Sequence, residues 1–358
     1  MKDKYLILAI NTGSTSTKVS AYENENAVFS ASIKHSTEEL NRFQSVWDQY
    51  DYRKNSVIGA VVNNGLKLND FDIIACRGGN IKPVKGGIYE VTTKMLEDMK
   101  SGKYGIHPTN VGNLVAYDIG QENKIPVVTI DPPVTDELCD YARFSGIPQI
   151  SRQSSFHALN QKATARKVAA KLQRAYEELN MIVVHMGGGI SVGAHEKGLV
   201  IDVNNALDGD GPFSPERAGT LPNAALIKMC FSGEYDKTQM LKLMTGKGGL
   251  VAYLGTTDAL EIEARIQNGD KYAEDVYMAM AYQVVKEIGS MAAVLGGKVD
   301  AIAFTGSLAY SKRLMDFIKP RVSFIAPIYE VPGENEMEAL AAGALRYITG
   351  KEQPRIYE

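Results

Sequence analysis

The chain has 358 residues, a length at which two domains are the ordinary expectation. Its composition, 44% hydrophobic and 23% charged, is typical of a globular protein with a substantial core. A formal net charge of −3 gives nucleic acids and acidic membranes no electrostatic attraction, so we expect a small-molecule partner.

The cysteines and the apolar segments bear on the cellular compartment. Cys76, Cys139 and Cys230 lie far apart, without the spacing of a zinc site or a disulfide framework, which favours a reducing compartment. The first apolar run is shorter than the core of a signal peptide. The stretch from Tyr277 to Leu295 is interrupted by polar and charged residues, which predicts a buried helix rather than a membrane span. We therefore expect a cytoplasmic protein.

Three strands are predicted at the start of the chain. Residues 5–10 (YLILAI) form an unbroken apolar run, the pattern of a buried strand. The turn NTGST, the alternating segment KVSAYE, a second turn and AVFSASI follow. The same order returns from residue 181 as MIVVH, the glycine turn MGGGI, SVGAH, the turn EKG and LVIDV. This repetition predicts a duplicated architecture, although strand, glycine turn and strand also succeed one another by chance.

Helices are predicted after each group of strands. Apolar residues recur at helical spacing over 156–179, and Gly296 and Gly297 end the helical segment 272–295. The predicted segments are helices over 156–179 and 272–295, a strand over 299–306, a helix from near Leu308 and a last helix over about 335–348. No stretch resembles a flexible linker, so we expect two domains joined by short, ordered connections.

The first hairpin turn carries donors suited to a phosphate. Gly13 lets backbone amides approach a polyanion, Ser14 and Ser16 add hydroxyl groups, and Lys18 adds a point charge. Because the turn joins two strands and lacks the required glycines, it is not a P-loop. The alternative is a polar hairpin whose hydroxyl groups satisfy only the turn itself.

The matching turn of the second group consists of three adjacent glycines, Gly187, Gly188 and Gly189. A simple turn needs one or two, so a closely approaching ligand explains three better. His185 beside this turn either donates to a bound phosphate or is structural. Gly306 and Ser307 lie between a strand and a helix, where backbone dipoles can bind a nucleotide or form an ordinary tight turn.

The doubled hairpin plan resembles the actin, sugar-kinase and Hsp70 ATPase superfold. Most members of that superfold begin with Asp, whereas Asn11 opens the pattern Asn-x-Gly-Ser-x-Ser-x-Lys, which resembles the acetate kinase family. Five further signatures follow in the family's order. They are CRGGN with Arg77, TIDPPVTDE with Asp131, SSFHALNQ with His157, HMGGG, and PERAGTLP with Arg217. The segment GLVAYLGTTD, which ends at Asp258, resembles a glycine-containing segment that lies beside the nucleotide in this family.

Within the family, the three-glycine turn, NALDGDGPFSPERAGTLP and PGENEMEAL are more similar to the butyrate and branched-chain acid kinases than to the acetate kinases. Acetate kinases carry Asn where Gly188 stands, and a Glu of their metal site falls where this chain reads SLAY at residues 307–310. Glu338, or Glu336, of the last helix is the candidate replacement.

The resemblance implies an α/β protein with a duplicated two-domain actin-like ATPase fold, ribonuclease H-like in each half, and an active-site cleft between the domains. Residues 1–155, joined by a C-terminal segment of about 335–358, would bind the acyl substrate and phosphate, and residues 156–334 would bind the nucleotide. The implied cofactors are ATP or ADP and Mg²⁺, with Asp131 and Glu338 as metal ligands, and the implied assembly is a homodimer or larger. The nucleotide would contact Asn11, Gly13, Ser14, Ser16, Lys18, His185, Gly187, Gly188, Gly189, Asp258, Gly306 and Ser307.

The implied reaction is reversible phosphoryl transfer between ATP and a short-chain acid such as butyrate. A carboxylate is already ionised at pH 7 and needs no general base, so the obstacle is its repulsion from ATP. Positive groups, a metal and in-line positioning must then supply catalysis. With the family match, Arg77 binds the carboxylate or the phosphoryl group, Arg217 the γ-phosphate, and His157 its equatorial oxygens. Without it, the arginines form ion pairs, His157 contacts a helix start, and Asp131 begins a turn.

The same residues bear on three competing functions and one that they exclude. An acetate or propionate kinase of the same family is the nearest alternative. A sugar kinase needs an Asp base, which Asp131 could supply, but Asn11 and the two arginines argue against it. A non-catalytic actin-like nucleotide switch is a further alternative, but the sequence shows neither the insertions of a filament-forming protein nor an added peptide-binding domain. A dinucleotide oxidoreductase is excluded because the glycine turns join strands to strands.

Overall fold

The computed structural model describes residues 2–358, which form two compact units. Unit 1 comprises the chain up to Thr135 together with Asn335–Glu358, and unit 2 comprises Asp136–Glu334. The chain enters unit 2 earlier than the boundary expected at residue 155. The reason is bonding within unit 2, where the Cys139 N–H donates to the carbonyl of Ile201 at 2.9 Å.

Unit 1 is built on a six-stranded sheet with the order β3-β2-β1-β4-β6-β5. Strand β2 is antiparallel to both β1 and β3, whereas β1, β4 and β6 run parallel to one another, and β5 is antiparallel to β6. Strand β1 is buried along nearly its whole length, as its unbroken apolar run predicts. The strands are β1 Leu6–Thr12, β2 Ser16–Glu23, β3 Asn26–Lys34, β4 Ile73–Cys76, β5 Ile88–Glu90 and β6 Val127–Ile130.

Unit 2 repeats this plan in a five-stranded sheet with the order β9-β8-β7-β10-β11. Its first three strands are antiparallel and β7, β10 and β11 run parallel, as β1, β4 and β6 do. Both second hairpins shift register, at Ala21/Tyr22 and at Ala194/His195. The predicted duplication is therefore confirmed. The strands are β7 Asn180–Met186, β8 Ile190–Glu196, β9 Leu199–Val203, β10 Ala301–Thr305 and β11 Ile328–Glu330.

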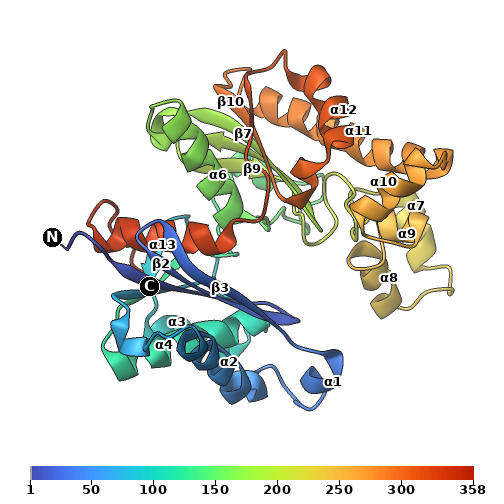
Figure 1. The fold of residues 1–358 in the computed structure, drawn as a ribbon. Helices are drawn as coiled ribbons and strands as arrows, with labels where there is room; N and C mark the ends of the chain where they lie inside the picture. The colour runs from blue at the N-terminus through green and yellow to red at the C-terminus, as the bar shows by residue number, and fades with distance from the viewer. Residues whose placement is uncertain (1) are drawn as a thin grey trace. The chain divides into compact units, whose positions relative to one another are not determined.

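Helices cover both faces of the unit 1 sheet (Figure 1). Helix α4 packs on β1 and β4 with α2 and α3 beside it, and α13 returns from the C-terminal part of the chain onto β1, β4 and β6. Glycines allow the close approach, since a Cβ at Gly112 of α4 would lie 2.1 Å from Thr12 Oγ1. The helices are α1 Thr37–Leu40, α2 Tyr50–Asn63, α3 Thr93–Ser101, α4 Pro108–Asn123 and α13 Glu336–Ile348, with 3-10 turns at Trp47–Gln49 and Leu68–Asp70.

The two faces of the unit 2 sheet bury alternate residues of the same strands. Met181 and Val183 pack in the cluster beneath α6, whereas Ile182 and Val184 pack beneath α11, because successive side chains of a strand point to opposite faces. The helices are α5 Asp140–Arg143, α6 Ala158–Lys171, α7 Asn223–Cys230, α8 Lys237–Met244, α9 Leu250–Leu254, α10 Ala259–Gln267, α11 Lys271–Val294 and α12 Lys312–Val322.

Two predicted helices differ in detail. The helix expected over 156–179 ends at Lys171, because Gln173 takes a left-handed conformation with φ of 55° before a 3-10 turn at Tyr176–Glu178. The helix expected from Leu308 begins as the 3-10 turn Ser307–Tyr310, and α12 follows it. Within residues 2–358 no helix combines the length and the apolar character needed to cross a membrane.

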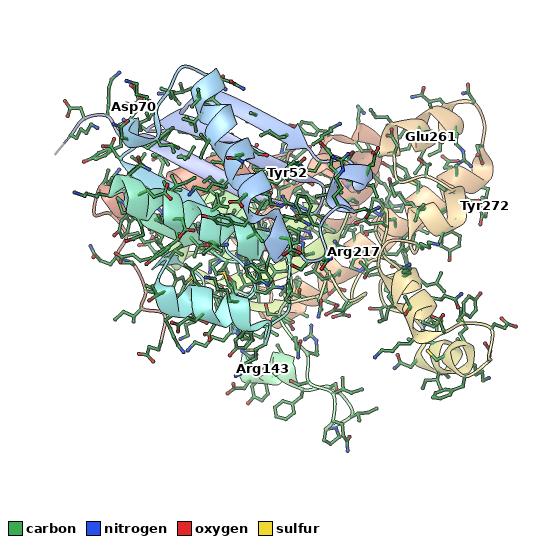
Figure 2. The ribbon with its side chains drawn as sticks, turned by 90° about the horizontal axis from the view of Figure 1, so that it is seen from below. Tyr52, Asp70, Arg143, Arg217, Glu261 and Tyr272 are labelled. Carbon is green, nitrogen blue, oxygen red and sulfur yellow. The ribbon has the colours of Figure 1, made fainter. Side chains whose placement is uncertain are left out.

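A projecting segment around Arg143 follows the start of unit 2 (Figure 2). Two parallel hydrogen bonds of 2.8 and 2.9 Å join the Arg143 guanidinium to the Asp136 carboxylate. Arg152 donates to the Ala142 carbonyl at 2.8 Å. Held in this way, the segment exposes large apolar side chains, with Tyr141 91% and Phe144 78% exposed.

A buried ion pair ties α6 to the edge of the unit 2 sheet. Lys162 Nζ lies 2.9 and 2.7 Å from the two carboxylate oxygens of Glu137, and the two side chains are 3% and 1% exposed. Glu137 also accepts the Val200 N–H of β9 at 2.8 Å. This pair therefore fixes the helix whose first turn carries His157.

Replacing Lys162 by Met should lower the free energy of unfolding by about 3–5 kcal/mol, because it removes the ammonium group that faces the buried Glu137 carboxylate. Urea unfolding followed by circular dichroism would measure the change. Lys312→Met is the matched control, since Lys312 pairs with Asp316 on the surface and its loss should change stability by less than about 0.5 kcal/mol. Equal effects of the two substitutions would contradict the prediction.

Candidate active site

Three predicted site residues stand at the carboxyl ends of the parallel strands of unit 1. Asn11 lies near the end of β1, Arg77 directly follows β4, and Asp131 directly follows β6. Ligands of open α/β sheets bind at this edge, because the loops that leave the strands gather there. The sheet topology thus brings together residues up to 120 positions apart in the sequence (131 − 11 = 120).

Glu336, the first residue of α13, joins two of these residues. Asn11 Nδ2 donates to Glu336 Oε2 at 2.7 Å, and Arg77 Nε lies 3.2 Å from Glu336 Oε1. Glu338, two residues further on, lies on a different face of the helix. Burial and then the negative charge of Glu338 raise the pKa of Tyr22 on β2. Glu336, one of the two acidic candidates of the last helix, is thus in contact with Asn11 and Arg77.

The Arg77 guanidinium is only partly satisfied. Its side chain is 14% exposed, and Nη1 is buried with no hydrogen-bond partner among the described residues. A buried charged donor without an acceptor is costly, by about 1–3 kcal/mol or more. An anionic ligand at this position would supply the missing acceptor.

Asp131 is held by the backbone of Gly87. Its Oδ1 accepts the Gly87 N–H at 2.7 Å, its own N–H donates to the Gly87 carbonyl at 2.9 Å, and it is fully buried. Its φ of 40° lies in the left-handed region, which a residue other than glycine adopts at an energetic cost. The carboxylate is therefore fixed in place at the end of β6.

The hairpin turn between β1 and β2 is supported by a buried arginine that sequence reasoning missed. Arg53 of α2 is fully buried and donates to the carbonyls of Ser14 and Ser16 and to Thr17 Oγ1, at 3.1–3.3 Å. Its remaining hydrogen bond goes to Gln49, so its partners are neutral, and burial lowers its pKa. The positive charge beneath the turn favours an anion above it. No local pattern in α2 marks this residue.

The turn itself presents its tip to solvent. Ser14 and Thr15 are exposed, and the Gly13 N–H closes the turn on the Ser16 carbonyl at 2.8 Å. Lys18 pairs with Asn11 in the strand register. His107 at the start of α4 approaches the turn, with Nε2 3.4 Å from Ser14 Oγ. Burial, then the charges of Arg77 and Arg53, lower the pKa of His107.

In unit 2, Gly188 and Gly189 of the three-glycine turn have different surroundings. A Cβ at Gly189 would lie 1.9 Å from Arg217 Nη1, so this glycine makes room for the arginine. The nearest atom to a Cβ at Gly188 is Glu216 Oε1 at 3.6 Å, and Gly188 faces a pocket. A ligand was the reason expected for all three glycines, but a protein side chain accounts for Gly189.

Arg217 resembles Arg77, since its side chain is 13% exposed and incompletely hydrogen-bonded. Its Nη1 donates to the Ala206 carbonyl at 2.7 Å, and Glu216 lies 3.9 Å from Nη2. Nε is buried without a hydrogen-bond partner in residues 2–358. Burial lowers the pKa of Arg217, with the acidic neighbours Glu216 and Asp208 acting in the opposite direction.

His157 and His185 stack on each other. Their ring centroids lie 3.8 Å apart and their planes differ by 16°. His157 Nδ1 lies 2.9 Å from Ser191 Oγ, and His185 Nδ1 lies 2.8 Å from Asn160 Oδ1. Both histidines therefore have fixed ring orientations beside the three-glycine turn.

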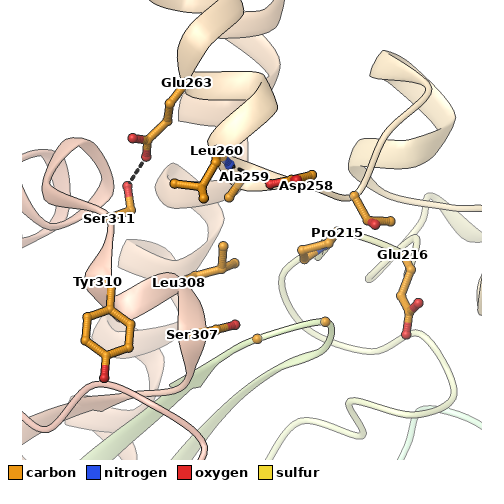
Figure 3. Close-up of a pocket in the computed structure, with 13 residues that line it drawn as sticks. Pro215, Glu216, Asp258, Ala259, Leu260, Glu263, Ser307, Leu308, Tyr310 and Ser311 are labelled. Atoms are coloured by element: carbon orange, nitrogen blue, oxygen red, sulfur yellow. Dashed lines mark hydrogen bonds between the residues drawn. The ribbon is translucent and has the colours of Figure 1, made fainter. Parts of the chain in front are cut away.

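A pocket of about 490 Å³ collects several predicted nucleotide residues (Figure 3), and this volume lies in the usual range for small-molecule sites. Gly187, Gly188, Asp258 and Ser307 line it. The other walls include Pro215, Glu216, Leu260, Glu263 and Leu308.

Two of the predicted nucleotide residues around this pocket have structural roles. Asp258 caps α10 by accepting the Leu260 N–H at 2.9 Å. Gly306 does not line the pocket, and a Cβ there would lie 2.3 Å from the Met186 carbonyl oxygen. Close packing of β10 on β7 is therefore sufficient to require this glycine.

Comparison with known proteins agrees with this fold. Residues 141–313 match the sequence profile of the Acetokinase family. The chain is 49% identical over 355 residues to butyrate kinase 2 of Clostridium acetobutylicum, covering 99% of this chain and all of that protein. The chain belongs to the acetokinase family. Members of this family are phosphotransferases with a carboxyl acceptor, which confirms the predicted carboxylate kinase and its use of ATP and ADP.

Solved structures of the acetokinase family confirm the fold. The acetate kinase of Porphyromonas gingivalis superposes with a TM-score of 0.75 at 17% identity, covering 95% of this chain and 98% of that one. A propionate kinase of Francisella tularensis superposes with a TM-score of 0.71 at 18% identity and the same coverage. The predicted two-domain actin-like ATPase fold is therefore correct.

Gly189→Ala should lower the free energy of unfolding by about 1–3 kcal/mol, because the new methyl group must displace the Arg217 guanidinium. Gly188→Ala, one residue earlier, meets no atom closer than 3.6 Å and should change stability by less than about 0.5 kcal/mol. Thermal unfolding of the two variants without nucleotide would test this. A Gly189→Ala protein as stable as Gly188→Ala would refute the close contact.

Proposed function

We propose that this acetokinase-family protein transfers the γ-phosphoryl group of ATP reversibly to butyrate or a branched short-chain acid, giving the acyl phosphate and ADP. The support for butyrate is the 49% identity to a butyrate kinase over almost the whole chain. Acetate and propionate remain the alternative acids within the family. The solved acetate and propionate kinases, at 16–18% identity, support the fold rather than the acid.

The observation that carries the mechanism is that Arg77 and Arg217 each have a buried nitrogen with no hydrogen-bond partner among the described residues. A short-chain carboxylate is ionised at pH 7 and attacks without a general base, so the reaction needs neutralisation of two anions. We assign Arg77 to the carboxylate or the transferred phosphoryl group and Arg217 to the γ-phosphate. A bound oxygen would provide the acceptor that Arg77 Nη1 and Arg217 Nε lack.

The remaining residues hold and orient the phosphate groups. Arg53 places a positive charge behind the turn of Gly13, Ser14 and Ser16, which suits a phosphate bound by amides and hydroxyl groups. His157 is assigned to an equatorial oxygen of the transferred group. In unit 2, the pocket beside Gly187 and Gly188 is suited to the nucleotide, since the Leu260 and Leu308 side chains offer apolar walls to a base.

Mg²⁺ belongs to this proposal, and the oxygen donors at the carboxyl ends of β1 and β6 suit it. Among residues 2–358 no group of three or more His, Cys, Asp and Glu side chains could hold a metal by itself. Mg²⁺ usually takes one or two protein carboxylates and completes its shell with phosphate oxygens and water. Asp131 and a glutamate of α13 would provide these, with Glu336 better placed than Glu338. When bound, the ion would neutralise charge on the phosphate oxygens.

We further propose a cytoplasmic homodimer or larger homo-oligomer. All three cysteines, Cys76, Cys139 and Cys230, are free thiols, which fits a reducing compartment. The rigid segment that exposes Tyr141 and Phe144 offers apolar surface for a subunit contact.

A panel of C2 to C5 acids tests the substrate. With ATP, Mg²⁺ and hydroxylamine, butyrate and isobutyrate should give acyl hydroxamate at a higher kcat/KM than acetate or propionate. Glucose and glycerol, as hydroxyl acceptors, should give no ADP above background. A preference for acetate would establish the alternative within the family, and ATP hydrolysis indifferent to every acid would refute carboxylate phosphorylation.

Arg77→Ala and Arg217→Ala should each lower kcat/KM for butyrate by about 10³ or more, roughly 4 kcal/mol of transition-state stabilisation, as for other arginines that bind a transferring phosphoryl group. Arg42→Ala is the control, because the Arg42 side chain is 69% exposed and pairs with the exposed Glu38 at 3.5 Å. Circular dichroism would confirm folding. Losses below tenfold for both variants would exclude the assigned roles.

A further inference from the structure

A buried row of hydrogen bonds runs behind His157 in unit 2. It links the Ser191 hydroxyl group of β8, the Gln161 amide of α6, the His195 imidazole of β8 and the Tyr176 hydroxyl group. Ser191, Gln161 and His195 are fully buried. Because water does not reach these groups, each hydrogen must be given to a partner within the row.

The Gln161 amide can take only one orientation. Its nitrogen lies 3.1 Å from the Ser191 backbone carbonyl, which only accepts hydrogen bonds, so the NH₂ group must face it. The same NH₂ group lies 2.7 Å from Ser191 Oγ. Gln161 Oε1 then faces His195 Nε2 at 2.9 Å, so that this nitrogen carries a hydrogen.

The far end of the row agrees with this direction. Complete burial, followed by the charges of Lys162 and Arg166, lowers the pKa of His195 well below its ordinary value, so the ring is neutral at pH 7. With its hydrogen on Nε2, His195 accepts at Nδ1 from the Tyr176 hydroxyl group, 2.7 Å away. The hydrogen bonds therefore run from Tyr176 through His195 and Gln161 to Ser191.

The near end determines the state of His157. Ser191 Oγ already accepts a hydrogen from the Gln161 NH₂ group, and the other hydrogen-bond partner of the hydroxyl is His157 Nδ1 at 2.9 Å. The Ser191 hydrogen must point to His157 Nδ1, since otherwise it would be buried without an acceptor. A neutral His157 that accepts at Nδ1 carries its own hydrogen on Nε2.

We propose that Ser191 and Gln161 are positioning residues that fix His157 as the neutral tautomer with its hydrogen on Nε2. This inference rests on the proposed function in one respect, namely that Nε2–H is the group that donates to the transferred phosphoryl oxygen. The stack on His185 holds the ring plane, while the row of hydrogen bonds determines which nitrogen donates. The opposite tautomer would place a lone pair against an anionic oxygen.

Long-range ¹H–¹⁵N correlation spectra of the histidine-labelled protein test the tautomer directly, without any measurement of activity. The chain has five histidines, so comparison with His157→Gln assigns the signal. At pH 7.5, His157 should show a protonated Nε2 and an unprotonated, hydrogen-bonded Nδ1. A hydrogen on Nδ1, or on both nitrogens, overturns the proposal.

Variants test the positioning role. In Ser191→Ala the His157 Nδ1 resonance should shift, because this nitrogen loses its donor, and kcat should fall roughly three- to tenfold, the effect of one neutral hydrogen bond. KM for ATP and butyrate should stay within about twofold. Gln161→Met should give the same pattern, and Ser20→Ala, a buried serine of β2 bonded to Ser30, should give neither change.

The outcomes separate the two proposals. A His157 spectrum that is the same in Ser191→Ala as in the unaltered protein refutes the positioning role, whatever the activity. If the predicted tautomer is found but His157→Gln keeps full activity, the donor role of His157 in the proposed function fails, whereas the fixed tautomer stands.

Discussion

Two arginine side chains that each hold a buried nitrogen without an acceptor are the feature on which the proposed chemistry of this structure depends. Arg77 and Arg217 each keep one such nitrogen, at the carboxyl end of β4 and beside the three-glycine turn. Folding leaves these groups incompletely bonded, and an anion relieves them. A reaction between two anions needs such positive groups, because their mutual repulsion is the main obstacle to phosphoryl transfer onto a carboxylate.

The surrounding elements hold these arginines rather than neutralise them. Glu336 lies against Nε of Arg77 and is shared with Asn11, while Nη1 of Arg77 has no partner among the described residues. In unit 2, Arg217 donates to the Ala206 carbonyl, and Glu216 lies 3.9 Å from its guanidinium group. Gly189 leaves space for that group because it has no side chain. Arg53 likewise bonds to neutral groups and keeps its charge beneath the first hairpin. Charge is thus retained where phosphate oxygens are expected.

Several site features could not be predicted, because their causes are tertiary. The reason for Gly189 is a side chain 28 positions later (217 − 189 = 28). Arg53 carries no signal in the helical pattern of α2, and its role appears only when α2 packs beneath the hairpin. The sequence does not distinguish Glu336 from Glu338 as a site residue. The orientation of α13 decides this, because it places Glu336 against Asn11 and the charge of Glu338 near Tyr22.

The sequence by itself determined the doubled strand plan, the family and the residue types of the site, because apolar periodicity and short ordered motifs are local properties of the chain. Tertiary structure alone decided which of those residues meet: Asn11 with Glu336 and Arg77, Gly189 with Arg217, and His157 with Ser191. The physical reason is that hydrogen bonds and close contacts act over 2–4 Å, whereas these partners lie tens to hundreds of residues apart and only sheet order and helix packing bring them together.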